Sequence, residues 1–132
     1  MPLPRPICTR IPVELEAELE ERFLDLEWSP SEGLRAIVSE WLALGRFPEL
    51  EFRDTAVGRR AAVRGGPEVW EVAAVAGPGF ASAGGLEARV REHFSWVATE
   101  ALEQALGYAA AYPAEVERII DRNRRLAGRS RA

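Results

Sequence analysis

Arginine is the residue with the greatest capacity for chemistry in this chain. All 17 basic residues are arginines, and five of them lie within residues 122–132, a segment without any acidic residue. The chain as a whole is nevertheless acidic, with a net charge of −4. A guanidinium group forms paired hydrogen bonds with phosphate or carboxylate, and charge asymmetry of this kind often marks an interaction segment. An arginine-only composition is also typical of a GC-rich genome, so both explanations stay open.

Residues that could catalyse a reaction or hold a metal are scarce. Cys8 and His93 are the only residues of their kinds, so a zinc site of histidine and cysteine within one chain is not expected. Residues 77–79 are glycine-rich but lack the strand-to-helix setting of a phosphate-binding loop. His93 lies beside Phe94 on an amphipathic segment, which favours a surface position over a catalytic base. We therefore expect no enzyme activity, no catalytic residue, no metal and no cofactor.

Length and composition predict a cytoplasmic protein with one ordinary domain or two very small ones. The 132 residues are 47% apolar, which is enough for a modest core. No apolar run approaches the roughly 18 residues of a membrane span, and no signal-peptide pattern opens the chain. A single cysteine also excludes an internal disulfide framework.

Two amphipathic helices are predicted within the first 46 residues. Over residues 13–27, apolar side chains recur every three or four positions between glutamates. Ser29 then precedes Pro30, and Glu32 follows at capping-box spacing, so a second helix should begin here. That helix should end near Gly45. It carries its apolar side chains on one face: Leu34, Ile37, Val38, Trp41 and Leu42.

A short strand over residues 7–11 is predicted to precede these helices, and it has no partner strand nearby. Its unpaired backbone groups are most simply satisfied by the same strand of a second copy, in an antiparallel ribbon across a two-fold axis. The four prolines of this region all occupy even-numbered positions, where N–H groups can point away from the partner strand. The ladder is therefore expected to use the odd positions, Ile7, Thr9 and Ile11. The side chains expected to face outward are Pro6, Cys8 and Arg10.

This order of elements resembles the ribbon-helix-helix (CopG/MetJ/Arc-like) family of DNA-binding domains. The resemblance covers about residues 5–45, in the strand ending RIP at 10–12, the glutamate-rich helix, SPSEGLR at 29–35 and EWL at 40–42. It implies a homodimer whose paired strands enter the major groove, while the second helix grips phosphate at its N-terminus. Carried over, the DNA contacts fall to Arg5, Pro6, Cys8, Arg10, Ser29 and Ser31, and Arg10 could contact guanine through two hydrogen bonds. A ribbon that only dimerises the chain is the alternative.

Residues 50–121 are predicted to form a β-hairpin followed by short helices. The expected elements are strands over 50–53 and 60–64, a helix opening at Pro67, a loop over 77–85, and helices over about 86–94, 99–112 and from Pro113 to 120. A helix, a short turn and a second helix together have helix-turn-helix geometry.

This second segment resembles small VapB-like helix-turn-helix antitoxins, a family long described only as a domain of unknown function. The likeness lies in GRRAAVRG at 58–65, VWEV at 69–72, ALEQALGYAA at 101–110 and YPAEV at 112–116. It implies a partner, a PIN-like ribonuclease toxin whose acidic cluster holds metal ions and attracts an antitoxin arginine. The candidates are Arg122, Arg124, Arg125, Arg129 and Arg131. Contact with nucleic-acid phosphate, or a solvated terminus without a partner, are the alternatives for this tail.

The sequence thus predicts a mainly α protein with short β elements, in three parts. These are a ribbon-helix-helix domain over 1–46 whose ribbon is swapped in a dimer, a β-hairpin and helix-turn-helix domain over 50–121, and a basic tail over 122–132. The expected function is that of a type II antitoxin, which binds operator DNA as a dimer and neutralises its toxin. A stand-alone ribbon-helix-helix regulator with a ligand- or protein-sensing C-terminal domain is the alternative, and a structural assembly module is a third. No membrane partner is expected.

Overall fold

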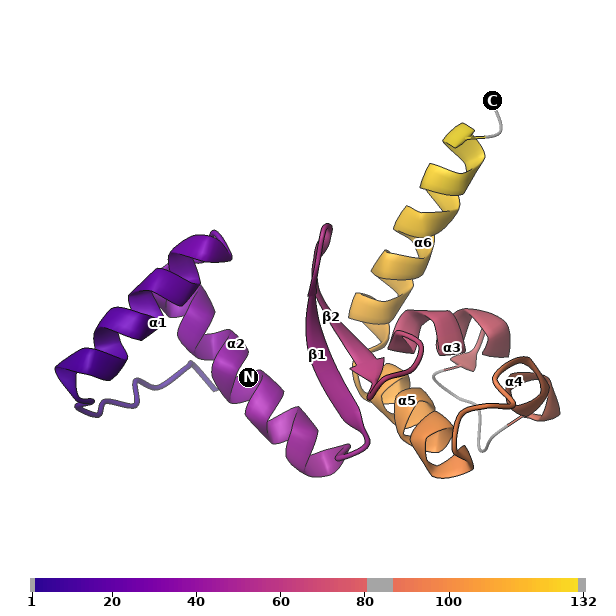
Figure 1. Cartoon of the computed structure of the whole chain (residues 1–132), viewed down its shortest axis with the longest axis horizontal. Helices are drawn as coiled ribbons and strands as arrows, with labels where there is room; N and C mark the ends of the chain where they lie inside the picture. Colours follow the sequence, from indigo (N-terminus) through magenta and orange to yellow (C-terminus); the bar gives the residue numbers. More distant parts are fainter. Residues whose placement is uncertain (1, 81–86, 131–132) are drawn as a thin grey trace. The chain divides into compact units, whose positions relative to one another are not determined.

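A computed structural model describes residues 2–80 and 87–130. In this structure the chain forms two compact units. Unit 1 covers residues 1–39, and unit 2 covers residues 40–132. The described part of the chain is mainly helical with a small antiparallel sheet of two strands, as the sequence predicts (Figure 1). In chain order the elements are α1 (Val13–Asp25), α2 (Pro30–Arg46), β1 (Leu50–Thr55), β2 (Gly58–Val63), α3 (Val69–Ala76), α4 (Ala88–His93), α5 (Thr99–Ala111) and α6 (Pro113–Ser130).

Helix α1 begins directly after Pro12, as expected from a residue whose φ is fixed near the helical value. Glu14 and Glu16 occupy its first turn, where carboxylates interact favourably with the helix dipole. The helix ends at Asp25, slightly before the predicted end. The chain then reverses through Glu27, whose φ of 56° lies in the left-handed region.

Helix α2 begins with the predicted serine cap. The Ser29 hydroxyl oxygen accepts a hydrogen bond from the Glu32 backbone N–H at 3.2 Å, which satisfies one of the free donors of the first turn. The Gly33 N–H then donates to the Ser29 carbonyl at 2.9 Å, closing the first helical hydrogen bond. The helix runs to Arg46, one residue past the predicted end.

The interior of unit 1 is very small. Phe23 is the buried side chain of α1, only 5% exposed, and its ring lies 6.4 Å from that of Trp28. It packs directly against the backbone of Gly33, because a Cβ built on Gly33 would lie 2.2 Å from the ring. The missing side chain of Gly33 therefore lets α1 and α2 approach each other around Phe23.

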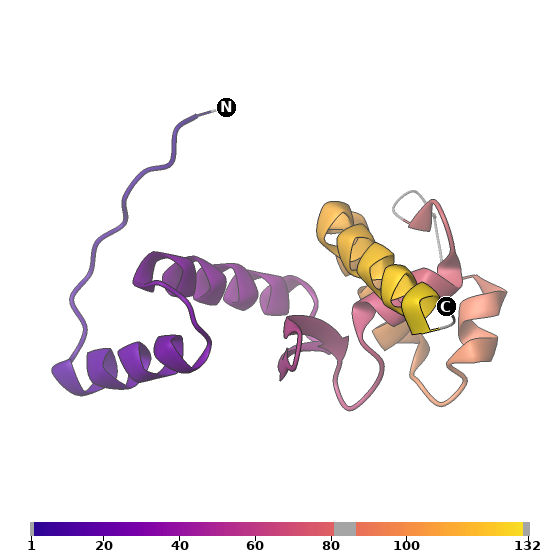
Figure 2. The same cartoon turned by 90° about the horizontal axis from the view of Figure 1, so that it is seen from above.

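Residues 2–12 form neither a helix nor a strand in the single chain. They are exposed throughout, and Figure 2 shows them as a trace leading away from α1. Among the described residues, strands occur only mid-chain, in β1 and β2. The strand predicted over residues 7–11 is therefore not formed in the single chain. Its expected partner is a second chain, and the ribbon stays a prediction about the dimer.

The β-hairpin of unit 2 forms where the sequence predicts it, but its strands are longer and its turn is shorter. Leu50 pairs with Val63 at one end of the ladder, and Thr55 pairs with Gly58 at the other. The turn therefore contains only two residues, 56 and 57. Gly58 has a φ of +118°, a backbone conformation that glycine adopts without steric cost.

The hydrophobic core of unit 2 lies around α3 and α5. Val72 and Ala73 of α3, together with Ala105 and Ala109 of α5, have no exposed surface. These small side chains allow the two helices to pack closely. The end of α2 joins this core through Ala43, and the remaining members come mostly from the hairpin, α4 and α6.

Tyr108 of α5 organises an aromatic cluster within this core. Its ring makes edge contacts with Phe47 at 5.9 Å and Phe52 at 6.1 Å between centroids, an arrangement that aromatic pairs favour. Its hydroxyl donates to a Glu115 carboxylate oxygen at 2.9 Å. Burial, followed by the negative charge of Glu115, raises the pKa of the Tyr108 phenol well above its usual range.

Alkaline pH should therefore destabilise unit 2 through Tyr108. The unfolded chain releases the phenolic proton above a pH of about 10, whereas the folded chain retains it, so this contribution is complete below that pH and is lost as the pH rises. The free energy of unfolding should fall by up to about 1.4 kcal/mol per pH unit beyond that point. Denaturant titrations between pH 8 and 12 would measure the slope, and Tyr108→Phe should flatten it. An unchanged slope in Tyr108→Phe would contradict the assignment.

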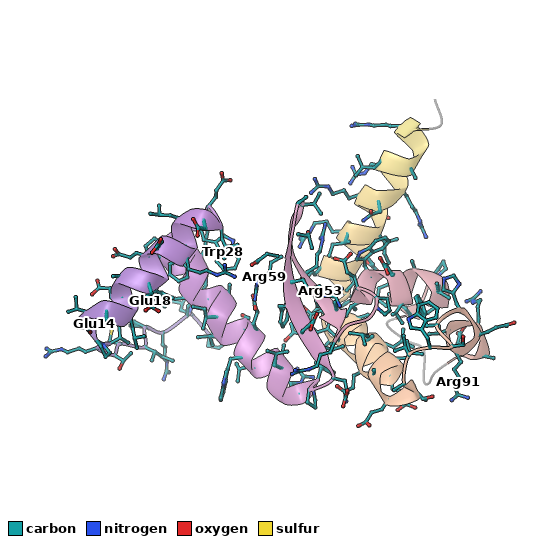
Figure 3. All side chains as sticks on the ribbon, in the orientation of Figure 1. Glu14, Glu18, Trp28, Arg53, Arg59 and Arg91 are labelled. Atoms are coloured by element: carbon teal, nitrogen blue, oxygen red, sulfur yellow. The ribbon has the colours of Figure 1, made fainter. Side chains whose placement is uncertain are left out.

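Arg59 ties the hairpin to the C-terminal part of α2 within unit 2. Its guanidinium donates to both carboxylate oxygens of Glu40, at 2.5 and 2.7 Å, and to Asp54 at 2.6 Å (Figure 3). The Glu40 hydrogen bonds, opposed in part by burial, raise the pKa of Arg59. Arg53 fixes the other end of the hairpin, donating to the carbonyls of Val63 at 2.7 Å and Gly66 at 2.8 Å. Both arginines therefore stabilise the fold and are not available for a partner.

The helices that follow the hairpin differ from the sequence prediction mainly at their ends. Helix α3 begins at Val69 rather than at Pro67, and α4 is shorter than expected; its predicted start at residue 86, like residues 81–85 of the predicted loop, lies outside the described residues. Helix α6 is much longer than predicted and continues to Ser130. The boundary that we expected at residue 122, between a domain and a basic tail, is therefore not a break in secondary structure.

Candidate nucleic-acid and protein interfaces

The predicted base-reading residues lie on the exposed N-terminal segment. Arg5, Pro6, Cys8 and Arg10 are all exposed in the single chain, and Cys8 is a free thiol. No secondary structure fixes their side chains to a common face. The alternation that would place three of them together depends on the ribbon, which requires a second protomer.

The predicted phosphate-gripping residues lie together at the start of α2. Ser29 and Ser31 are both exposed, and the Ser29 hydroxyl is engaged in capping the helix. The backbone N–H groups of the first helical turn are the usual anion-binding groups at such a position. The structure thus supplies a well-formed helix N-terminus, and whether phosphate binds there stays a prediction.

A large apolar surface runs along one side of α2. Its members are exposed by between 43% for Ile37 and 75% for Trp41. We call this set the α2 apolar face, and it consists of Leu34, Ile37, Val38, Trp41 and Leu42. Monomeric soluble proteins rarely expose contiguous apolar surface of this kind. The sequence predicted that these residues share one apolar face of the helix, and in the single chain nothing among the described residues buries them.

Unit 1, which contains Leu34, Ile37 and Val38 of this face, exposes further apolar side chains. Helix α1 exposes Val13, Leu15 and Leu24, and the N-terminal segment exposes Ile7 and Ile11. These two isoleucines occupy odd positions of the predicted ribbon, on the opposite face from the side chains expected to point outward. With little more than Phe23 buried, unit 1 has a very small core, and domains of this size usually need oligomerisation, a disulfide or a metal to be stable.

The C-terminal arginines lie on the exposed half of α6. Val116, Ile119 and Ile120 pack this helix into unit 2, and beyond Asn123 every described side chain up to residue 129 is exposed. Figure 1 shows the last turns of α6 projecting from the rest of unit 2. The exposed arginines predicted to bind the toxin are Arg122, Arg124, Arg125 and Arg129. Arg131 lies outside the described residues.

The helical continuation divides these arginines between two faces. At 100° per residue, Arg122, Arg125 and Arg129 share one face, whereas Arg124 lies more than about 90° away from it. Arg118 belongs to the first face as well. Arg118 was not grouped with these residues from the sequence, because the helix was expected to end before the tail, although the 118–122–125–129 spacing is itself a helical repeat.

Arg124 borders a hollow of about 230 Å³ in unit 2. The hollow lies between the end of α3, the turn over residues 77–80 and α6, which contributes Glu117, Ile120 and Asp121 as well as Arg124. Its walls therefore combine an apolar surface with charges of both signs. A space of this size can admit one or two side chains of a protein partner.

Comparison with known proteins assigns the chain to no family. No protein-family model matches the chain, and no curated protein and no solved structure is significantly similar to it. Within residues 2–80 and 87–130, no helix is long and apolar enough to cross a membrane. The same residues contain no group of three or more histidine, cysteine or acidic side chains that could hold a metal ion.

Proposed function

We propose that the chain is a homodimeric DNA-binding regulator of the antitoxin type. In this proposal, unit 1 forms the dimer and contacts operator DNA, and unit 2 binds a PIN-like ribonuclease toxin. The observation that carries the proposal is the exposed α2 apolar face, together with the near absence of a core in unit 1. Both features are expected of half of a dimer, because each protomer leaves exposed what its partner will cover.

The N-terminal segment fits the same arrangement. Its prolines alternate with residues that have backbone N–H groups, and it carries exposed isoleucines at positions 7 and 11. Pairing with the equivalent segment of a second chain would satisfy the backbone and would place both isoleucines against the helices. The outward face would then present Arg10 and Cys8 of both protomers to the major groove.

The DNA-binding part of the proposal is tested by Arg10→Ala. A bidentate contact from arginine to guanine contributes about 1–3 kcal/mol of base discrimination, so affinity for the operator should fall by roughly 10- to 100-fold. Gel-shift titration on the DNA upstream of the gene, beside an unrelated duplex, would measure both affinity and specificity. Arg91→Ala is a suitable control because Arg91 is exposed on α4 of unit 2 (Figure 3).

The operator affinities of Arg10→Ala and Arg91→Ala distinguish base reading from an effect of net charge. If Arg10→Ala binds the operator as tightly and as selectively as the unchanged protein, the groove assignment of the N-terminal segment is wrong. If both substitutions weaken binding equally, the effect is one of net charge.

The toxin contact is the more specific part of the proposal. We narrow it to the face of α6 that carries Arg124, because this exposed arginine lies beside a hollow with an apolar wall. A guanidinium in this position could enter the acidic metal-binding cluster of a nuclease while the hollow accepts a side chain in return. Co-purification with the product of the neighbouring gene would test the pairing, and an operon without a nuclease would favour the stand-alone regulator instead.

A further inference from the structure

A row of four arginines runs along α6 on the side opposite its buried residues. Their spacing of four, three and four residues keeps Arg118, Arg122, Arg125 and Arg129 within an arc of about 60°. Val116 and Ile120, which pack into unit 2, lie on the opposite side of the helix. We call these four residues the α6 arginine row.

The four side chains of the row have no anionic partner within the described part of the chain. All four are exposed, and none takes part in the ion pairs or hydrogen bonds that fix Arg53, Arg59 and Arg89. The acidic residues closest in sequence are engaged elsewhere or lie to one side. Glu115 accepts the Tyr108 hydrogen bond, and Glu117 and Asp121 line the hollow with Arg124.

We propose that the α6 arginine row binds the phosphate backbone of duplex DNA. The row repeats one charged group at intervals of about 4.5–6 Å over about 16 Å of helix, which suits the regular charge of a polynucleotide. Interfaces with DNA are far more positively charged than those with protein. Protein hot spots combine arginine with buried aromatic anchors such as Trp and Tyr, and the arc of the row contains no aromatic or other apolar side chain.

This surface is distinct from both surfaces of the proposed function. The N-terminal ribbon would read bases and Arg124 would face the toxin, whereas the row would add contacts that carry no sequence information. Such contacts raise affinity uniformly and make it strongly dependent on salt. The row would thus supply attraction to DNA that an otherwise acidic chain lacks.

The test compares neighbouring arginines on different faces of the same helix. Full-length protein carrying Arg125→Gln, its matched control Arg124→Gln, or glutamine at all four positions of the row would be titrated with a ~20-base-pair duplex unrelated to the operator. Fluorescence anisotropy at several salt concentrations gives the slope of log affinity against log salt. Glutamine has a helix propensity close to that of arginine, and circular dichroism would confirm that α6 is retained.

The proposal predicts specific changes in this slope. Each phosphate contact contributes about 0.9 to it, so for each protomer that contacts the duplex Arg125→Gln should reduce the slope by about 1 and the fourfold variant by about 3–4. Arg124→Gln should leave it nearly unchanged. Equal slopes for the fourfold variant and the unchanged protein would overturn the proposal, and so would equal effects of the two single substitutions.

The same variants separate this inference from the proposed function. The duplex carries no operator, so a failure of base reading by Arg10 leaves the predicted slopes unaffected. If the fourfold variant loses the nuclease while its salt slope is unchanged, the row binds protein and the DNA assignment is wrong. If the slope falls and nuclease binding persists, both surfaces act as proposed.

Discussion

Val38→Glu is expected to leave the chain monomeric at concentrations at which the unchanged protein is a dimer. Val38 is 57% exposed in the single chain, so a carboxylate at this position stays hydrated there and clashes with nothing inside the protomer. In the dimer the substitution occurs twice, and each carboxylate would lose water without gaining a partner. Desolvation of an unpaired charge costs several kcal/mol, so the dissociation constant should rise by about 10³-fold or more.

Ser39→Glu is the matched control for this experiment. Ser39 is the next residue along α2, is also exposed, and points about 100° away from Val38. Ser39 borders the same hollow as Leu34 and Val38, but its substitution removes no apolar side chain from the α2 apolar face, so its effect should be much smaller. Sedimentation equilibrium over micromolar concentrations would give the association state, and circular dichroism would report whether the helices persist.

Two results would count against the dimer. The first is an unchanged protein that sediments as a monomer at micromolar concentration, which would leave the α2 apolar face without the partner we assign to it. The second is an equal effect of Val38→Glu and Ser39→Glu, which would show that added charge, and not loss of the apolar contact, governs association. Operator affinity should fall together with dimerisation in Val38→Glu, because the ribbon forms only between two chains.

Local sequence signals were sufficient to predict most of the secondary structure. The Ser29 cap and the start of α2 follow from a proline preceded by a serine, with a glutamate three residues later. The hairpin follows from two β-prone stretches around Gly58, whose positive φ fixes where the turn ends. In these cases the physical cause lies within a few residues, so a single sequence contains it.

The features that the sequence did not predict have physical causes that lie more than a few residues away along the chain. Helix α6 continues through the basic tail, although this part has little apolar surface to bury and its arginines repel one another. The packed half of the helix, held by Val116 and Ile120, nucleates the turns that follow, and propagation is easier than nucleation. The grouping of Arg118 with the later arginines became evident only once that continuation was known.

The positions of the candidate DNA-binding side chains cannot be predicted from the sequence for a different reason. Arg10 and Cys8 are exposed and lie outside any helix or strand in the single chain, and the intermolecular strand stays a prediction. Their arrangement depends on a partner protomer, so neither the sequence nor one folded chain determines it. The α2 apolar face, by contrast, was predicted as an apolar stripe from its spacing, and its exposure is the new information from the structure.

Two glycines of α2 should respond in opposite directions to the same substitution. Gly45→Ala adds a methyl group where nothing lies within 4 Å. It should stabilise the protein by about 0.5–1 kcal/mol, because alanine loses less conformational entropy than glycine in a helix. Gly33→Ala gains the same term, but its Cβ would lie between 2.2 and 2.5 Å from three carbon atoms of the Phe23 ring.

For Gly33→Ala, steric overlap should outweigh the helical gain. Phe23 is the buried centre of unit 1, so moving its ring aside either separates α1 from α2 or exposes the ring to water. Overpacking of this kind costs about 1–3 kcal/mol, which leaves a net destabilisation of up to about 2.5 kcal/mol after the helical term. Thermal unfolding of both variants at one fixed protein concentration would measure the difference, since association also contributes to the midpoint.

A functional consequence follows because Gly33 also belongs to the first turn of α2. Its N–H donates to the Ser29 carbonyl, so displacement of the Phe23 ring would disturb the helix N-terminus that is expected to grip phosphate. Gly33→Ala should therefore weaken operator binding, whereas Gly45→Ala should preserve it. If Gly33→Ala proves as stable as Gly45→Ala, Phe23 does not occupy the space above Gly33, and the close approach of α1 and α2 that defines unit 1 is wrong.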